Sequence, residues 1–282
     1  MMREVRSIPL LTGACRHPQA MTIRGGTFRP VDFHAVAMLL LHPEEGPILF
    51  DTGYDPAFLQ ATARFPEALY RWVTPVSLPP GADAASQCRA LGHDPAEVRH
   101  VVLSHFHGDH IAGLHAFPNA IVHCARAGLD DLGRRNRLGA TRRGLLPSLL
   151  PDDLLQRARF FEDAPRMALP GDFAPFDRGA DILGDGSLLA VDLPGHCPGH
   201  WGLALRDAKW GPHMLVADAA WSLEAIRRNR PPPALATAWL GNTARSRATL
   251  DALHRLAIRN PDLRLTPCHC PERAAEIGVA QP

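Results

Sequence analysis

The amino-acid sequence predicts an α/β protein with its sheets inside and its helices outside. Short apolar runs bounded by turn residues, as expected for buried strands, occur in both halves of the chain, and segments of helical composition are interleaved with them. Motifs containing histidine and aspartate follow several of these runs between Asp51 and His269, which favours a single domain over residues 1–282. The composition, with 46% hydrophobic residues, 21% charged residues and a formal net charge of +1, is that of a soluble globular protein.

The N-terminal part is predicted to contain a buried β-hairpin. Apolar side chains run almost unbroken over 33–41, and the run 47–50 follows a Pro-Glu-Glu-Gly turn. The segment around Thr12 and Cys15 is expected to be a loop. Residues 55–82 combine aromatic residues with many prolines, so we expect a loop with short helices that lines either a substrate pocket or a small satellite core.

The next segment is predicted to alternate between helices and strands. Residues 83–91 have helical composition and stop at Gly92, and Asp94 followed by proline is a typical helix N-cap. Strands are expected at 100–104 and 120–123.

Residues 125–180 are predicted to be a variable helical insertion. Amphipathic fragments at 145–150 and 152–159 indicate helices that are interrupted by several prolines. The pattern favours helices that cover one face of a sheet.

The C-terminal part is again predicted to be rich in strands. Strands are expected at 182–183, 188–193, 202–205, 213–217 and 263–265, with helices at 248–258 and 272–277. Two of these strands would place His196 and Asp218 at their ends.

The most informative stretch is the heptapeptide from Ser104 to His110, with the sequence Ser-His-Phe-His-Gly-Asp-His. Three imidazoles and one carboxylate fall within six positions directly after an apolar run, and these ligand types suit zinc, iron or manganese. An extended chain sends His105 and His107 to the same side, and Asp109 and His110 follow on a tightening turn where they can face a second ion. We interpret the stretch as a metal site rather than a histidine-rich surface loop.

At these residues the sequence resembles the metallo-β-lactamase fold superfamily of metallohydrolases. Five motifs occur in the family's order and cover most of the chain: 49–53 with Asp51, the heptapeptide, 194–200 with His196, 217–218 with Asp218, and 267–269 with His269. The resemblance implies a four-layer αβ/βα sandwich. Within the superfamily the sequence is most similar to N-acyl homoserine lactonases and neighbouring lactone or ester hydrolases.

The resemblance also implies a cofactor of two divalent metal ions, with zinc first and iron or manganese as alternatives. One ion would be held by three histidines, namely His105, His107 and His196. The second would be held by Asp109, His110 and His269, with Asp218 bridging the two ions. Asp51 would support the ligands through hydrogen bonds, and His200 would have a structural role. The thiols of Cys197, Cys268 and Cys270 are next to these residues in sequence, but we expect them to point away.

The resembled family implies a dinuclear metal-dependent hydrolase that acts on a lactone, ester or thioester. Water would be the nucleophile, and Asp109 would be the catalytic residue that hands a proton to the leaving group. The bridging Asp218 argues against zinc β-lactamases, which lack it. A glyoxalase II-like thioester hydrolase and a persulfide dioxygenase are alternatives. A metal-binding sensor or partner-binding module with little turnover is a further alternative from a different class.

One position departs from the resembled lactonases, which have a tyrosine three residues after the bridging aspartate. Here that residue is Trp221, which has no hydroxyl group to polarise a carbonyl. We expect Trp221 to border the metal cleft as a substrate-binding residue, with burial in the core as the alternative. Phe106, inside the heptapeptide, is the second candidate for substrate binding.

Insertions near residues 125–180 often form a lid or a dimer contact in the resembled superfamily. A homodimer is therefore compatible with the sequence. If the segment is a lid, four apolar residues would line it: Phe160, Phe161, Met167 and Phe173.

The expected partner is a small-molecule substrate. The near-neutral net charge gives no indication of nucleic-acid binding, and the longest apolar run, 35–41, is far shorter than the ~20 residues that span a membrane. The six cysteines lack Cys-x-x-Cys spacing and the density of a disulfide scaffold, which favours reduced thiols and a cytoplasmic location.

Overall fold

Two β-sheets pack face to face in the computed structural model, which describes residues 2–280. In spatial order, the first sheet contains β7 (Ala158–Phe160), β6 (Ile121–Cys124), β5 (His100–Val102), β3 (Gly46–Phe50), β2 (Pro30–His42) and β1 (Glu4–Pro18), with β4 (Val76–Ser77) beside β1. The second sheet contains β13 (Arg264–Pro267), β12 (Gly211–Ala217), β11 (Trp201–Asp207), β10 (Leu188–Asp192), β9 (Arg178–Asp181) and β8 (Arg166–Ala168).

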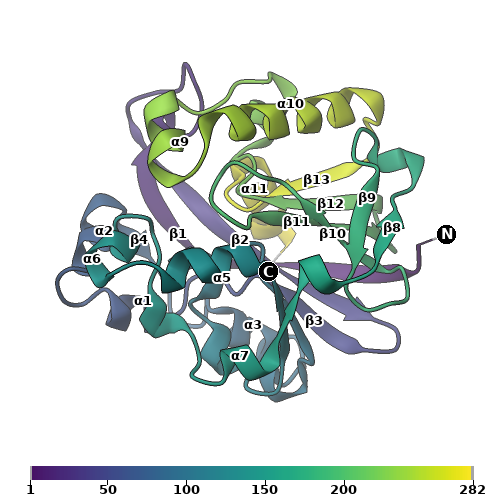
Figure 1. Cartoon of the computed structure of the whole chain (residues 1–282), viewed down its shortest axis with the longest axis horizontal. Helices are drawn as coiled ribbons and strands as arrows, with labels where there is room; N and C mark the ends of the chain where they lie inside the picture. Colours follow the sequence, from purple (N-terminus) through teal and green to yellow (C-terminus); the bar gives the residue numbers. More distant parts are fainter. Residues whose placement is uncertain (1, 281–282) are drawn as a thin grey trace.

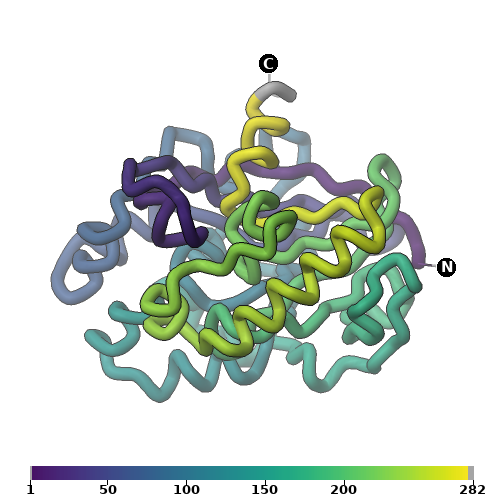
Figure 2. The backbone as a smooth tube through the Cα atoms, turned by 90° about the horizontal axis from the view of Figure 1, so that it is seen from above, coloured from purple at the N-terminus to yellow at the C-terminus, as the bar shows by residue number. Residues whose placement is uncertain are grey.

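Helices lie outside the sheets on both sides, as predicted. The chain forms α1 (Pro56–Ala61), α2 (Ala68–Val73), α3 (Ala84–Ala90), α4 (Gly108–Ile111), α5 (Arg126–Gly133), α6 (Arg137–Thr141), α7 (Leu154–Arg157), α8 (Leu223–Arg227), α9 (Ala234–Leu240), α10 (Thr243–Arg259) and α11 (Pro271–Ala280). In the view of Figure 1, α3 and α7 lie below the strands and α1, α2 and α6 lie to their left, whereas α9 and α10 lie above them. Seen from above, α10 runs diagonally across the molecule (Figure 2).

Three apolar layers hold this sandwich together, and β2 shows how one strand contributes to two of them. Leu39 belongs to the layer between the first sheet and its helices. Met38 and Leu40 point the other way, into the layer between the two sheets, where they join Leu203. A third layer around Leu253 of α10 lies on the outer face of the second sheet. Both faces of β2 are buried over residues 35–40, where its sequence is an unbroken apolar run, and the predicted hairpin of β2 and β3 is confirmed.

Strand β1 joins the two sheets. Its residues Glu4 and Val5 pair in parallel with β11, and the remainder pairs antiparallel with β2. The register shifts between Leu11 and Ala14, around Gly13 with its φ of 87°. The prediction of a loop here was wrong. The register shift interrupts the alternation of buried and exposed positions, so the period-two pattern of a strand is hard to recognise in the sequence.

Residues 125–180 are only partly the predicted helical insertion. α-Helical structure ends with α7 at Arg157, and the remainder contains three short strands, β7, β8 and β9, together with two short 3-10 helices. Prolines mark breaks there without revealing whether a helix or a strand is broken. The candidate lid residues Phe161 and Phe173 are each 1% exposed and pack in the core. The favoured prediction of helices that cover one face of a sheet therefore holds only up to Arg157, because β7, β8 and β9 extend the sheets instead.

Candidate metal centre

All predicted ligands follow the ends of strands. Strand β5 ends at Val102, shortly before the heptapeptide, and β10, β12 and β13 end shortly before the remaining ligands. The structure brings them into two groups, in each of which the ligand atoms lie within 4.8 Å of one another. The first group contains His105, His107, His196 and Cys197, and the second contains His110, Asp218, Cys268 and His269.

The first group consists mainly of three imidazoles that point at a common centre. Nδ1 of His107 lies 2.9 Å from Nε2 of His105 and 3.0 Å from Nε2 of His196. Nitrogens bound to a tetrahedral zinc ion at 2.0–2.1 Å are about 3.3 Å apart, so this spacing suits a shared ion. Burial lowers the pKa of His107 to about 4 and holds the pKa values of His105 and His196 well below their usual range. The imidazoles are therefore neutral near pH 7, as metal ligands must be.

Asp218 connects the two groups. Its Oδ2 lies 3.3 Å from Nε2 of His196, and its Oδ1 lies 3.5 Å from Nε2 of both His110 and His269. Among the described residues, Oδ1 of Asp218 and both of these Nε2 atoms are buried without a hydrogen-bond partner. Each unpartnered buried polar atom costs roughly 1–3 kcal/mol. One cation would satisfy all three atoms, so the donor set fits a metal ion.

Asp109 lies beside the second group. Its Oδ2 is 3.3 Å from Nε2 of His269 and 3.8 Å from Nε2 of His110. Its Oδ1 accepts a hydrogen bond of 3.2 Å from the hydroxyl of Tyr70, which comes from α2. Sequence reasoning placed Tyr70 in a possible pocket wall but missed this contact, because the two residues are far apart in the chain.

Opposite charges compensate one another in the second group. Burial disfavours the charged form of His110, but the carboxylates of Asp51 and Asp109 outweigh it and hold the pKa of His110 well above its usual range. Burial is likewise outweighed at His269, where Asp218 raises the pKa. Burial would raise the pKa of both Asp109 and Asp218, yet the neighbouring imidazoles lower both values. Two buried carboxylates thus require positive charge, which protons or metal ions can provide.

Asp51 orients the ligands without joining either group, as predicted. Its carboxylate accepts hydrogen bonds from the Ser104 amide (2.8 Å), the Ser104 hydroxyl (2.7 Å) and Nδ1 of His110 (2.8 Å). Because Nδ1 of His110 donates to Asp51, Nε2 is left free to face the second group. Asp51 has a φ of 57°, an uncommon backbone conformation for an aspartate at the end of a strand.

Three further hydrogen bonds position Asp218 and His269. Nδ1 of His200 donates to the carbonyl of Leu193 (3.0 Å), so its Nε2 accepts from the amide of Asp218 (3.1 Å). This confirms the structural role predicted for His200. Nδ1 of His269 donates to the carbonyl of His34 (2.9 Å), which again leaves Nε2 free for the second group.

The two predicted substrate-binding residues have different surroundings. Trp221 is half-buried beside the ligands, with its ring 4.5 Å from that of His269 and in edge-to-face contact with Phe33 at 5.4 Å. Phe106 is 1% exposed, and a Cβ added at Gly128 would lie 2.8 Å from its ring. Both roles stay predictions, and its burial makes Phe106 the weaker candidate.

Two cysteine sulfurs lie closer to the ligands than expected. The expectation that Cys197 and Cys268 point away was wrong, because each belongs to one of the two groups. Burial raises the pKa of Cys268 to about 11 and that of Cys197 well above its usual range. Both thiols are therefore protonated near pH 7 in the metal-free protein, and protonated thiols are poor metal ligands.

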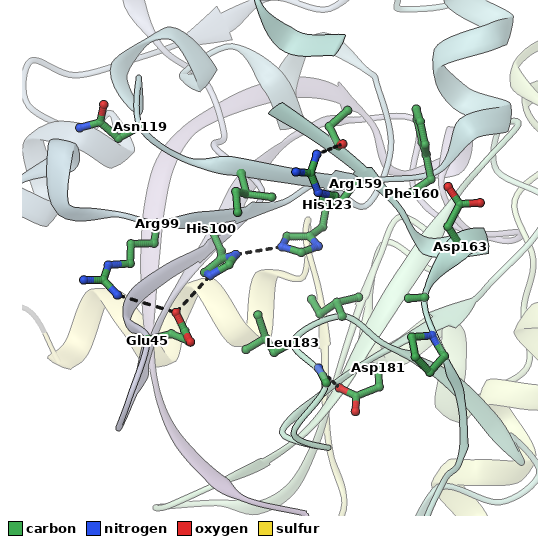
Figure 3. A pocket seen from close by; sticks show the side chains of 16 residues that line it. Glu45, Arg99, His100, Asn119, His123, Arg159, Phe160, Asp163, Asp181 and Leu183 are labelled. Atoms are coloured by element: carbon green, nitrogen blue, oxygen red, sulfur yellow. Dashed lines mark hydrogen bonds and ion pairs between the residues drawn. The ribbon is translucent and has the colours of Figure 1, made fainter. Parts of the chain in front are cut away.

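A cavity of about 710 Å³ lies elsewhere, near the start of strands β5 and β6 (Figure 3). A part-buried chain of hydrogen bonds lies along its wall, with His123 2.9 Å from His100 and His100 3.4 Å from Glu45. If His123 donates to His100 and His100 donates to Glu45, both contacts form with neutral imidazoles. The polar groups of His123, His100 and Glu45 therefore satisfy one another. The candidate metal centre at the other end of β5 differs, because it contains buried polar atoms without a partner among the described residues.

Comparison with known proteins points to one family. The family model described as "Metallo-beta-lactamase superfamily" matches residues 31–269. The N-acyl homoserine lactonase AttM of Azorhizobium caulinodans is 36% identical over 154 residues, which are 54% of this chain and 52% of that protein. An N-acyl homoserine lactonase of a Bacillus species is 24% identical over 192 residues, or 68% of this chain and 66% of that protein. The matched segment thus spans about half the length of AttM.

Solved structures share the fold along nearly the whole chain. An N-acyl homoserine lactone hydrolase with the product N-hexanoyl-L-homoserine bound at its catalytic metal center has a TM-score of 0.71 at 18% identity, and covers 98% of this chain and 97% of its own. The dizinc quorum-quenching lactonase AidC has a TM-score of 0.60 at 16% identity, covering 96% and 89%. At these identities the similarity establishes the fold.

No helix within residues 2–280 has the length and apolar character needed to cross a membrane.

Proposed function

Because the chain belongs to the metallo-beta-lactamase superfamily, we propose that it is a dinuclear metal-dependent hydrolase that opens lactone rings, with N-acyl homoserine lactones as the first substrates to test. The observation that carries this proposal is Asp218, whose two oxygens reach the two ligand groups. The named activity of the curated relatives supports the choice of lactones over other esters.

Divalent ions bound at the two groups would acidify a water molecule and polarise the ester carbonyl. In the first group, His105, His107 and His196 would hold one ion. The second ion would be held by His110, Asp218 and His269, with Asp109 beside them.

We assign the proton-transfer step to Asp109, which lies beside the second ligand group. In lactone hydrolysis water adds to the carbonyl carbon, the ring C–O bond breaks, and the released alkoxide oxygen gains a proton. The Asp109 carboxylate is 7% exposed, next to the ligands, and its lowered pKa keeps it ionised and able to accept the proton that water loses. It would then pass that proton to the alkoxide.

Trp221 would form an apolar wall next to His269. Its indole faces the ligand side of the sandwich and has no hydroxyl group, so we assign it to binding of the acyl chain rather than to polarisation of the carbonyl.

The test combines metal analysis with a substrate panel. Protein loaded with zinc, manganese or iron should hold two ions per chain and should hydrolyse acyl homoserine lactones faster than aryl esters or S-lactoylglutathione. His107→Ala should abolish this activity. A preference for S-lactoylglutathione would favour the thioester hydrolase alternative. Fewer than one ion per chain, or no turnover in any metal form, would reject the proposal.

A further inference from the structure

The two tyrosines of this chain, Tyr54 and Tyr70, lie in one aromatic stack next to the candidate metal centre. Phe58 is between them, in edge-to-face contact with Tyr54 at 5.0 Å and with Tyr70 at 5.2 Å. The hydroxyl of Tyr70 reaches Asp109, whereas the buried hydroxyl of Tyr54 makes no hydrogen bond within residues 2–280. The stack therefore brings the hydroxyl of Tyr70, and not that of Tyr54, to Asp109.

We propose that Tyr70 is the positioning residue of Asp109, holding one carboxylate oxygen so that the other faces the group of His110, Asp218 and His269. The proposal deepens the proposed function and rests on metal binding at that group. It also identifies a hydroxyl group, that of Tyr70, near the candidate metal centre, where Trp221 has none to offer.

The two oxygens of Asp109 have different partners. Oδ1 accepts from Tyr70 at 3.2 Å, and Oδ2 is 3.3 Å from Nε2 of His269. A phenol donates one hydrogen, so the bond to Oδ1 prevents the carboxylate from rotating freely about its Cβ–Cγ bond. Among the described residues no other side chain donates to Oδ1. Without Tyr70, either oxygen could turn toward the group or both could bind it together.

Tyr70 is itself held firmly. Phe58 is fully buried, and a Cβ added at Gly108 would lie 3.0 Å from its ring, so Phe58 packs directly against the backbone beside Asp109. On the other side, Glu67 at the start of α2 accepts two hydrogen bonds from Arg137 of α6, of 2.9 and 2.8 Å. The aromatic stack holds the Tyr70 ring beside Asp109, and the ion pair joins α2 to α6 at the surface.

The matched pair of variants is Tyr70→Phe and Tyr54→Phe in the full chain. Each removes one hydroxyl and keeps a ring against Phe58. Chelator competition with zinc measures the affinity for each of the two ions. Tyr70→Phe should weaken the binding of one ion by about 10- to 100-fold and leave the binding of the other unchanged. Removing a hydrogen-bond partner of a metal ligand has effects of this size. Tyr54→Phe should leave both affinities unchanged.

A spectroscopic readout separates positioning from general loss of structure. With cobalt(II) in place of zinc, Tyr70→Phe should alter the absorption of one of the two sites, while Tyr54→Phe should reproduce the parent spectrum. The melting temperature of the metal-free protein should be similar for both variants. An unchanged spectrum together with unchanged affinity for both ions in Tyr70→Phe would overturn the proposal.

A double-mutant cycle guards against misfolding of a single variant. If Tyr70 acts through Asp109, Tyr70→Phe should have no further effect on metal affinity in an Asp109→Ala background, in which the acceptor of the Tyr70 hydroxyl is gone. Additive effects would contradict the assignment. These measurements use metal binding alone, so they do not depend on lactone hydrolysis. If the parent protein binds two ions but hydrolyses no lactone, the proposed function is rejected. The role of Tyr70 in positioning Asp109 can still be tested in that case.

Discussion

Nδ1 of His110 donates a 2.8 Å hydrogen bond to Asp51, and the side chains of these two residues are 0% and 1% exposed. The bond ties the end of β3 to the turn that follows β5, so the orientation of one candidate metal ligand depends on a neighbouring strand. Such a contact affects folding and metal binding together.

Replacing Asp51 by Asn should damage both properties. Asn has one acceptor oxygen, so it cannot accept from Ser104 and His110 as the carboxylate does. We expect a loss of about 3–5 kcal/mol in the free energy of unfolding, typical of a broken buried pair, and about 10- to 100-fold weaker binding of the second ion. Urea denaturation and chelator competition measure these effects. Asp32→Asn, at a side chain that is 60% exposed, is the control and should change neither quantity.

Trp221→Ala should impair binding of long acyl chains more than short ones. The indole lies against His269, and each methylene that loses an apolar contact costs about 0.8 kcal/mol. KM should therefore rise more for decanoyl than for butanoyl homoserine lactone. Trp221→Tyr should retain or improve kcat by placing a hydroxyl near the carbonyl. If Trp221 is instead a core residue, Trp221→Ala would lose about 3–5 kcal/mol of stability and KM would change equally for both chain lengths.

Stability should decrease in mild acid because of His213. This side chain is fully buried in β12, with Nε2 2.8 Å from Thr266 Oγ1, and burial lowers its pKa to about 3. The unfolded chain has the ordinary value of about 6.5, so between these values it binds more protons than the folded protein. The free energy of unfolding is therefore not reduced by His213 above pH 6.5. Below that pH it falls by up to about 1.4 kcal/mol per pH unit until the pH approaches 3.

Urea denaturation of the metal-free protein between pH 4.5 and 7 measures this slope. His213→Gln keeps a donor for Thr266 and removes the titrating group. The free energy of unfolding of this variant should therefore vary less steeply with pH, because unfolding takes up to one proton fewer. Parallel curves for the two proteins would show that His213 does not titrate in this range.

Gly195→Ala should disrupt the loop that carries His196. Gly195 has a φ of 135°, and an added Cβ would lie 2.2 Å from the backbone nitrogen of Ser246 in α10. Backbone strain of roughly 1–3 kcal/mol would add to a steric clash of similar size. The control is Gly211→Ala, where φ is also positive at 71° but nothing lies within 4 Å of the added atom. Thermal melts should show a much larger loss for Gly195→Ala, together with weaker binding of the first ion.

Local patterns explain which parts of the fold could be predicted. The hairpin of β2 and β3 follows from two apolar runs around a turn, and α3 follows from a segment of helical composition that stops at Gly92; each pattern lies within a few residues. Strand β1 was missed because the register shift near Gly13 hides its alternation, and because its partners β2 and β11 are distant in sequence.

The same distinction applies to the candidate metal centre. The predicted histidines and aspartates come together because each follows the end of a strand, directly or after a short turn, and strand ends are visible in the sequence. Tyr70 and the sulfurs of Cys197 and Cys268 were misjudged because their approach depends on how helices and loops pack. No local pattern records that a phenol from α2 meets an aspartate from α4, even though both elements are short.

The two ligand groups lie across the junction of the two sheets. In each group, histidines that follow β5 of the first sheet meet residues that follow β10, β12 or β13 of the second. An ion bound to either group would therefore tie the two halves of the sandwich together, much as a disulfide does but reversibly. Metal at 100 times its dissociation constant would then add about 2.7 kcal/mol to the stability of the whole fold. A chelator would therefore lower the free energy of unfolding by removing the link between the two sheets.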